Sequence, residues 1–145
     1  MRLQGANSVG RLSIDFEVAN NDDMGAVRRG TLDPDKVRRM TISGLVDSGA
    51  TRLVLPKAVA KQLGLETTGK VKVRYADGRT ARRDAVAGAY VKIMGRGGVF
   101  TATVEPKRQN ALVGAIVMED LDFVIDCIHS RLVPRDPDYL VSEEE

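Results

Sequence analysis

The sequence predicts an all-β domain that closes into a barrel and carries one or two short helices. Two observations support this fold class. About seven to nine short apolar runs alternate with clusters of turn-forming residues, and only one or two segments have helical spacing. The 145 residues, 43% hydrophobic and 29% charged, fit a single domain. We expect this domain to span 1–145, with its core at 10–134 and a solvated tail at 135–145.

The first third of the chain predicts two strands joined by a long connection. Residues 10–18 alternate apolar and polar side chains, which is typical of a strand with one buried face. Residues 20–35 are rich in Asn, Asp and Gly, so we expect a loop or wide hairpin there. A second strand is expected at 37–46.

The remaining elements follow from apolar runs and turn signals. The run at 53–55 predicts a strand, and the helix after it is expected to begin at Pro56 and to end at Gly64. Asp77-Gly78 predicts the turn of a hairpin over 70–93. The further expected elements are a turn at Gly95, Gly97 and Gly98, a strand at 99–104, an apolar run at 111–114, a helix at 116–123 and a hairpin of 124–126 with 131–133.

Composition argues against several classes of protein. The chain has 22 Lys+Arg, 20 Asp+Glu and 4% aromatic residues, which does not favour a nucleic-acid binder. No apolar stretch approaches the ~20 residues of a membrane helix. The single cysteine, Cys127, excludes an internal disulfide, and with no apolar signal segment at the start we expect a cytoplasmic protein. With one histidine, His129, a zinc site of His and Cys is excluded, and we expect no metal and no cofactor.

The most specific signal is the segment Leu45-Val46-Asp47-Ser48-Gly49-Ala50. An Asp-[Ser/Thr]-Gly triplet alone is a weak signal, since it arises by chance in roughly one chain in fifteen of this length. Asp47 could also be only the first residue of an Asx turn. Its context is more specific, because two apolar residues precede it and a strand and a helix beginning with Pro follow it. A second apolar-apolar-Gly segment, Leu112-Val113-Gly114, comes about 65 residues after Asp47 and precedes the last predicted helix.

With these motifs the chain resembles the retropepsin-like aspartic proteases, most closely their small single-domain bacterial and archaeal members. The resemblance covers roughly residues 10–134 and implies a closed barrel of the acid-protease type with one short C-terminal helix. It implies that Asp47 is catalytic and that Ser48, Gly49 and Ala50 support its loop. It also implies a flap over the substrate, formed by Tyr75, Ala76, Asp77, Gly78 and Arg79, and a segment behind the catalytic loop, formed by Leu112, Val113 and Gly114.

The chemistry of such an enzyme determines its assembly. Two carboxylates share one proton, so that one activates a water and the other protonates the scissile carbonyl of a peptide. The chain holds one Asp-Ser-Gly, so a homodimer with Asp47 from each subunit is expected, acting on a peptide or protein substrate.

The sequence also departs from the retroviral members of the family. These carry acidic residues just after the loop and an Arg after the second glycine, whereas this chain has Thr51, Arg52 and Ala115. Substrate contacts are therefore expected to differ. A catalytically inert dimerisation or peptide-binding module is an open alternative, and a basic nucleic-acid module is a weaker one.

Overall fold

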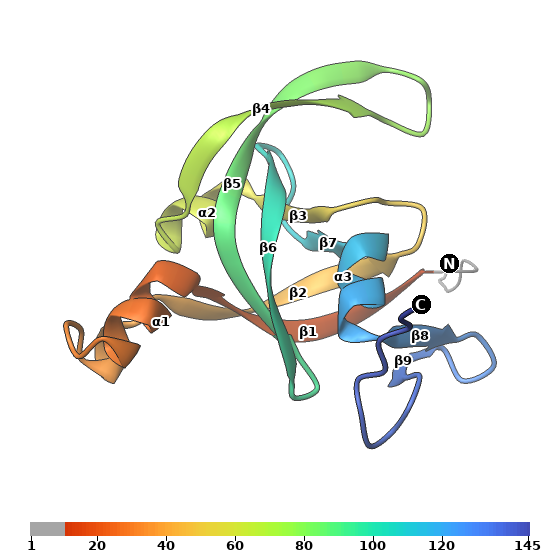
Figure 1. Cartoon of the computed structure of the whole chain (residues 1–145). Coiled ribbons are helices and arrows are strands. Elements are labelled where there is room, and N and C mark those ends of the chain that lie inside the picture. Colours follow the sequence, from red (N-terminus) through yellow and green to blue (C-terminus); the bar gives the residue numbers. More distant parts are fainter. Residues whose placement is uncertain (1–10) are drawn as a thin grey trace.

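The structure is a computed structural model that describes residues 11–145, so Gly10, the first residue of the predicted core, lies outside the described residues. It is a β-barrel with short helices at its ends (Figure 1). The strands are β1 (Arg11–Asn20), β2 (Arg39–Asp47), β3 (Leu53–Pro56), β4 (Glu66–Arg74), β5 (Thr80–Ile93), β6 (Arg96–Glu105), β7 (Ala111–Val113), β8 (Phe123–Asp126) and β9 (Arg131–Pro134). The helices are α1 (Asn21–Arg28), the 3-10 turn η1 (Pro34–Lys36), α2 (Lys57–Gln62) and α3 (Ala115–Leu121).

Six of the strands close the barrel. They are hydrogen-bonded in the order β1-β2-β7-β3-β6-β5, and β5 pairs with β1 to complete the ring. β4 pairs only with β5, so the β4–β5 hairpin extends beyond the ring and arches above it in Figure 1. β8 and β9 form a separate two-stranded sheet. The predicted fold class, an all-β closed barrel with a short C-terminal helix, is confirmed.

The core fills the barrel with aliphatic side chains. Val18, Val46, Leu55, Val91 and Val113 are each fully buried, and they come from five different strands of the ring. Burial of each such side chain stabilises the fold by roughly 1.5–3 kcal/mol. The alternation predicted for the first strand is also observed, because Phe16 and Val18 face this core.

The segment 20–35 differs from its predicted loop, because residues 21–28 form α1. Asn20 caps this helix: its side-chain oxygen accepts from the Asp23 N–H at 3.1 Å. Its amide nitrogen donates to the carbonyl of Leu63 at 2.8 Å. Asn and Asp favour turns in general, but they also favour the first residues of a helix, and composition alone does not separate the two.

Two hairpin turns differ from the sequence prediction. At the β4–β5 tip, the Gly78 N–H donates to the Tyr75 carbonyl at 2.9 Å and the Tyr75 N–H donates to the Arg79 carbonyl at 2.8 Å. With Gly78 at φ 87°, this is a three-residue loop ending in a glycine bulge, and not a two-residue turn at Asp77-Gly78. The β5–β6 turn is formed by residues 94–95, both at positive φ, so Gly97 and Gly98 belong to β6.

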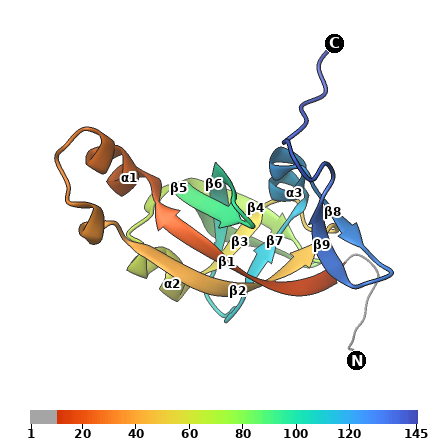
Figure 2. The same ribbon diagram turned by 90° about the horizontal axis from the view of Figure 1, so that it is seen from below.

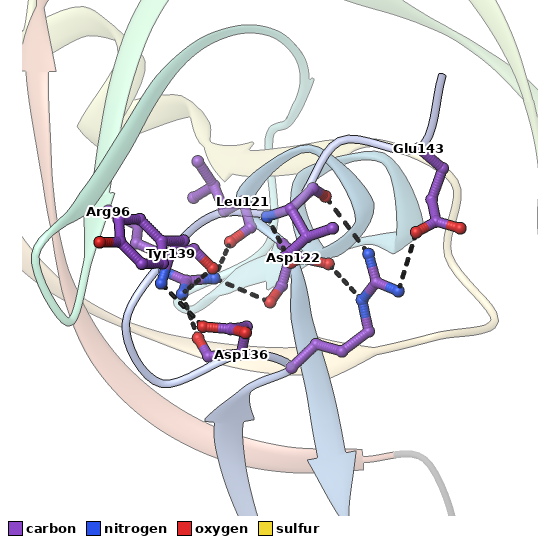
Figure 3. A network of polar contacts seen from close by, with 8 residues as sticks. Arg96, Leu121, Asp122, Asp136, Tyr139 and Glu143 are labelled. Atoms are coloured by element: carbon purple, nitrogen blue, oxygen red, sulfur yellow. Dashed lines mark hydrogen bonds and ion pairs between the residues drawn. The ribbon is translucent and has the colours of Figure 1, made fainter. Parts of the chain in front are cut away.

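Residues 135–141, expected to be solvated tail, are held against the end of α3 (Figure 3). Arg96 donates four hydrogen bonds, to the carbonyls of Leu121, Asp122, Asp136 and Tyr139. The Asp122 carboxylate accepts from Arg135 at 2.7 Å and from the Val141 N–H at 3.0 Å. These contacts lower the pKa of Asp122, chiefly through the backbone N–H of Val141 and then through Arg135.

None of the helices in the described part of the chain is long and apolar enough to cross a membrane.

Candidate active site

Asp47 is the last residue of β2, where the strand leaves the barrel. Its carboxylate oxygen Oδ1 accepts from the Gly49 N–H at 2.9 Å, and its carbonyl accepts from the Ala50 N–H at 3.1 Å. The first of these bonds is that of an Asx turn, which fixes the orientation of the carboxylate. A Cβ atom at Gly49 would lie 3.2 Å from the same oxygen, so the glycine lets the backbone approach the carboxylate closely.

The loop after Asp47 is supported from behind by β7 and α3. β7 runs parallel to β2, with Leu112 opposite Leu45 and Val113 opposite Val46. The first N–H groups of α3, which have no partner inside the helix, donate to the carbonyls of Ala50 at 2.8 Å and Thr51 at 3.0 Å. Residues 112–114 and the start of α3 therefore lie against β2 and the loop that follows it.

Gly114 lies in close contact with the backbone of the loop that carries Asp47. A Cβ atom at this position would lie 2.4 Å from the carbonyl oxygen of Arg52 and 2.8 Å from that of Ala50. Both are backbone atoms, which cannot move away without displacing the loop. Only glycine therefore allows β7 and α3 to pack directly against the loop that carries Asp47.

A groove of about 980 Å³ lies between this loop and the β4–β5 hairpin. The Asp47 loop forms one wall, the β4 arm of the hairpin forms the opposite wall, and the ends of β3, β6 and β7 complete the lining. The lining residues are Asp47, Gly49, Ala50, Thr51, Arg52, Val54, Val71, Lys72, Val73, Arg74, Tyr75, Ala76, Thr103, Glu105, Arg108 and Leu112. The groove brings a carboxylate next to apolar and basic side chains.

Glu105, on β6, fastens the hairpin to the barrel. Its Oε2 accepts from the Tyr75 hydroxyl at 2.7 Å, and its Oε1 accepts from Arg83 at 2.8 Å. Its side chain is only 12% exposed. Because the phenol donates to a carboxylate, the pKa of Tyr75 is raised, and the same carboxylate raises the pKa of Arg83. One glutamate thus holds both arms of the hairpin.

The predicted flap residues divide into two groups. Tyr75 and Ala76 line the groove, whereas Asp77, Gly78 and Arg79 form the turn beyond its lining. Arg79 donates to the two Asp77 oxygens at 3.0 and 2.7 Å, through its backbone N–H and its side chain, and these bonds lower the pKa of Asp77. The Arg79 guanidinium also lies 5.7 Å from the centre of the Tyr75 ring. The tip is therefore ordered by its own side chains.

The structure also differs from the sequence prediction in which residues line the groove. Ser48 is exposed and does not line the groove, and toward residues 11–145 its hydroxyl makes no hydrogen bond. Glu105 and Arg108 line the groove but were not predicted, because no local pattern marks them. Glu105 ends β6, which pairs with both β3 and β5, and Arg108 lies in the connection from β6 to β7. In the described chain, no group of three or more His, Cys, Asp or Glu side chains is placed to hold a metal ion.

Asp47 thus lies in the wall of a groove beside a closed barrel, beneath an overhanging hairpin. The family model for aspartyl proteases matches residues 36–125, more than half of the chain. The chain therefore belongs to the aspartyl protease family. A search of curated proteins gives no match.

Solved structures of viral proteases are similar in fold. The EIAV protease complexed with the inhibitor HBY-793 aligns with a TM-score of 0.52 and 17% identity, covering 81% of this chain and 93% of that one. The simian foamy virus protease aligns with a TM-score of 0.45 and 16% identity over 72% and 91%. A foamy viral protease-reverse transcriptase aligns with a TM-score of 0.45 and 18% identity over 54% of this chain, which spans only 10% of that protein. The alignment with the EIAV protease confirms the retropepsin-like fold expected from the sequence.

Proposed function

We propose that the protein is an aspartic endopeptidase that works as a homodimer, with Asp47 of each subunit in one catalytic pair. The observation that carries this proposal is the Asp47 carboxylate, oriented by Gly49 in the wall of a 980 Å³ groove beneath a hairpin. Membership of the aspartyl protease family supports the reaction class.

The reaction needs two carboxylates that share one proton. One takes a proton from a water, which attacks the scissile carbonyl, while the other protonates the carbonyl oxygen. Two carboxylates in contact cannot both ionise at low cost, so the pair stays singly protonated. Water is the nucleophile, and no covalent intermediate forms.

The composition of the groove supports a second chain as the source of the other carboxylate. Among the described residues that line it, the carboxylates are Asp47 and Glu105. Glu105 is already bound to Tyr75 and Arg83, so it is unsuited to exchange protons with a water. In the dimer, the exposed Ser48 hydroxyl would bond to the partner loop and lock the two loops together.

The hairpin would close over an extended peptide. Its Tyr75 and Ala76 contribute to the groove lining, and backbone groups at the tip would bond to the peptide backbone. Closure would exclude water from the catalytic pair and strengthen its electrostatic interactions. The apolar lining, which includes Val54, Val73 and Leu112, would contact substrate side chains.

The test is cleavage of a mixed peptide library by the wild type and by Asp47→Asn, over a range of protein concentrations and pH values. Activity should be lost in Asp47→Asn, should rise faster than linearly with concentration below the dimer dissociation constant, and should not need a metal. Asp35→Asn, an exposed carboxylate on η1, is the matched control and should keep full activity.

Two outcomes would contradict the proposal. Cleavage that persists in Asp47→Asn would show a different catalytic group. A wild-type dimer that cleaves nothing, and whose melting temperature does not rise with pepstatin, a mimic of the tetrahedral intermediate, would favour the inert peptide-binding module.

A further inference from the structure

The cations in the paired part of the β4–β5 hairpin, residues 66–87, fall into two groups. Three of them have a carboxylate partner within the hairpin or on β6. These pairs are Lys70–Asp84 at 2.6 Å, Arg79–Asp77 at 2.7 Å and Arg83–Glu105 at 2.8 Å.

Lys72, Arg74 and Arg82 form the second group, and all three are exposed. Toward the described residues none of them makes an ion pair, although carboxylates are available to their neighbours. Lys72 lies directly opposite Arg82 in the β4–β5 register. Like charges in that position destabilise a hairpin, so the sheet itself gives no reason for this arrangement.

The groove gathers cations from both of its sides. Lys72 and Arg74 line it from the hairpin, and Arg52 and Arg108 line it from the barrel. The Arg108 Nε donates to the Asn110 carbonyl at 2.9 Å, which orients this side chain without neutralising it. No carboxylate of residues 11–145 is paired with any of these four.

The two carboxylates that line the groove, Asp47 and Glu105, offset little of this positive charge. Glu105 is neutralised by Arg83 and accepts a hydrogen bond from the Tyr75 hydroxyl. Asp47, in the proposed mechanism, shares a proton with its counterpart. The shared proton leaves one negative charge on the two Asp47 carboxylates of a dimer, so the four cations that each subunit contributes remain in excess. A concave site with excess positive charge concentrates ligands of the opposite charge.

We propose that this groove selects peptide segments that carry Asp or Glu side chains near the bond to be cleaved, together with apolar residues. The inference rests on the proposed function and specifies its substrate class. The apolar side chains Val54, Val71, Val73 and Leu112 accommodate the apolar part of such a segment. A nucleic acid fits less well, because the lining offers one aromatic ring, Tyr75, as a stacking platform.

The experiment compares three matched peptide sets on the full-length protein: one with Asp and Glu, one with Asn and Gln at the same positions, and one with Lys. We expect kcat/KM for the acidic set to exceed that for the neutral set by roughly ten-fold at low salt, as two or three exposed ion pairs would give. The ratio should fall as salt rises, because the pairs are screened.

Charge reversal identifies the residues responsible. The double variant Lys72→Glu/Arg74→Glu should abolish the acidic preference, because Arg52 and Arg108 then face two glutamates in the groove. It should still fold, because a glutamate at position 72 faces Arg82 and replaces a repulsive pair with an attractive one. Lys92→Glu, an exposed cation of β5 outside the groove lining, is the control and should leave the ratio unchanged.

The outcomes separate this inference from the proposed function. If all three sets are cleaved at equal rates, or if the charge-reversed variant keeps the acidic preference, the selectivity is refuted and the protease remains. If no set is cleaved, the proposed function fails. Binding of the intact peptides to the protein then tests whether the groove prefers acidic segments. Preferential binding of the acidic set would then support the inference, whereas equal binding, or tighter binding of a single-stranded oligonucleotide, would refute it.

Discussion

The Tyr75 hydroxyl lies 2.7 Å from Oε2 of Glu105, and this bond joins the overhanging hairpin to the barrel wall. Tyr75 lies at the base of the hairpin tip, and Glu105 is the last residue of β6. Movement of the tip away from the groove must therefore break or stretch this bond. Arg83, bound to the other oxygen of Glu105, lies further along the hairpin and can keep the base in place.

Replacement of Tyr75 by Phe should loosen the tip while leaving the fold intact. The lost hydrogen bond is expected to reduce the free energy of unfolding by about 1 kcal/mol or less, because Glu105 keeps its ion pair with Arg83. Amide hydrogen exchange should accelerate in residues 74–80 and remain unchanged in β1 and β2. In peptide cleavage, KM should rise more than kcat falls, since the chemical groups are untouched.

Tyr90→Phe is the matched control for this substitution. Tyr90 lies on β5, but its ring covers Gly97 and it is not part of the groove lining. If the Tyr90 variant accelerated exchange at the hairpin tip as much as the Tyr75 variant, the bond to Glu105 would not be what holds the tip.

Replacement of Gly114 by Ala should damage the site from behind. The added methyl group would meet the backbone of residues 50–52, and we expect a loss of roughly 1–3 kcal/mol in the free energy of unfolding. Displacement of the Asp47 loop by even ~1 Å should lower kcat about 100-fold. Chemical denaturation and cleavage kinetics measure the two effects.

Gly30→Ala separates this steric effect from backbone strain. Gly30 has φ 77° with no atom within 4 Å of an added Cβ, so its substitution costs only the strain, roughly 1–2 kcal/mol. It should leave kcat unchanged. An unaltered kcat in the Gly114 variant would mean that the loop tolerates the displacement.

Asp47 and Glu105 show which site residues can be predicted from the sequence alone and which cannot. Asp47, its loop and the segment 112–114 were predictable because short motifs carry them, and the structure brings them together. Glu105 carries no motif, and its role depends on the pairing of β6 with β5, which is a long-range property. The basic lining of the groove has the same origin, because its four members come from three separate segments.

The fold was predictable to a similar extent. Alternating strands such as β1 and the glycine that ends α2 follow local rules. The helix α1 was missed because Asn20, its cap, has the composition of a loop and the contact with Leu63 becomes visible only in three dimensions. The docking of residues 135–141 was missed for the same reason, since Arg96 comes from the distant β6.

Arg96→Ala should release this C-terminal segment. Its guanidinium donates to four carbonyls and lies 5.4 Å from the centre of the Phe123 ring, so its removal leaves residues 135–141 with the Asp122 contacts alone. Limited proteolysis should cut within 135–141 several-fold faster than in the wild type. Arg39→Ala, which removes an exposed cation with one long ion pair to Glu17, is the control and should keep the wild-type cleavage rate. Equal rates for the Arg96 variant and the wild type would show that Asp122 suffices.

The ion pair between Asp23 and Arg38 should make stability depend on acid pH. Two hydrogen bonds from the Arg38 side chain, at 2.8 and 2.9 Å, lower the pKa of Asp23 from 3.8 to about 2. Because the folded pKa lies below the unfolded one, the pair stabilises the protein fully above about 3.8, and this stabilisation is lost as the pH falls toward 2. Asp23→Asn should therefore be less stable than the wild type at neutral pH, and the difference should shrink over that window in urea denaturation.

Asp22→Asn removes a charge from the same helical turn without removing this pair, and it should show no such convergence. A difference between Asp23→Asn and the wild type that stays constant down to pH 2 would mean that Asp23 contributes through its shape and hydrogen bonds, and not through its charge.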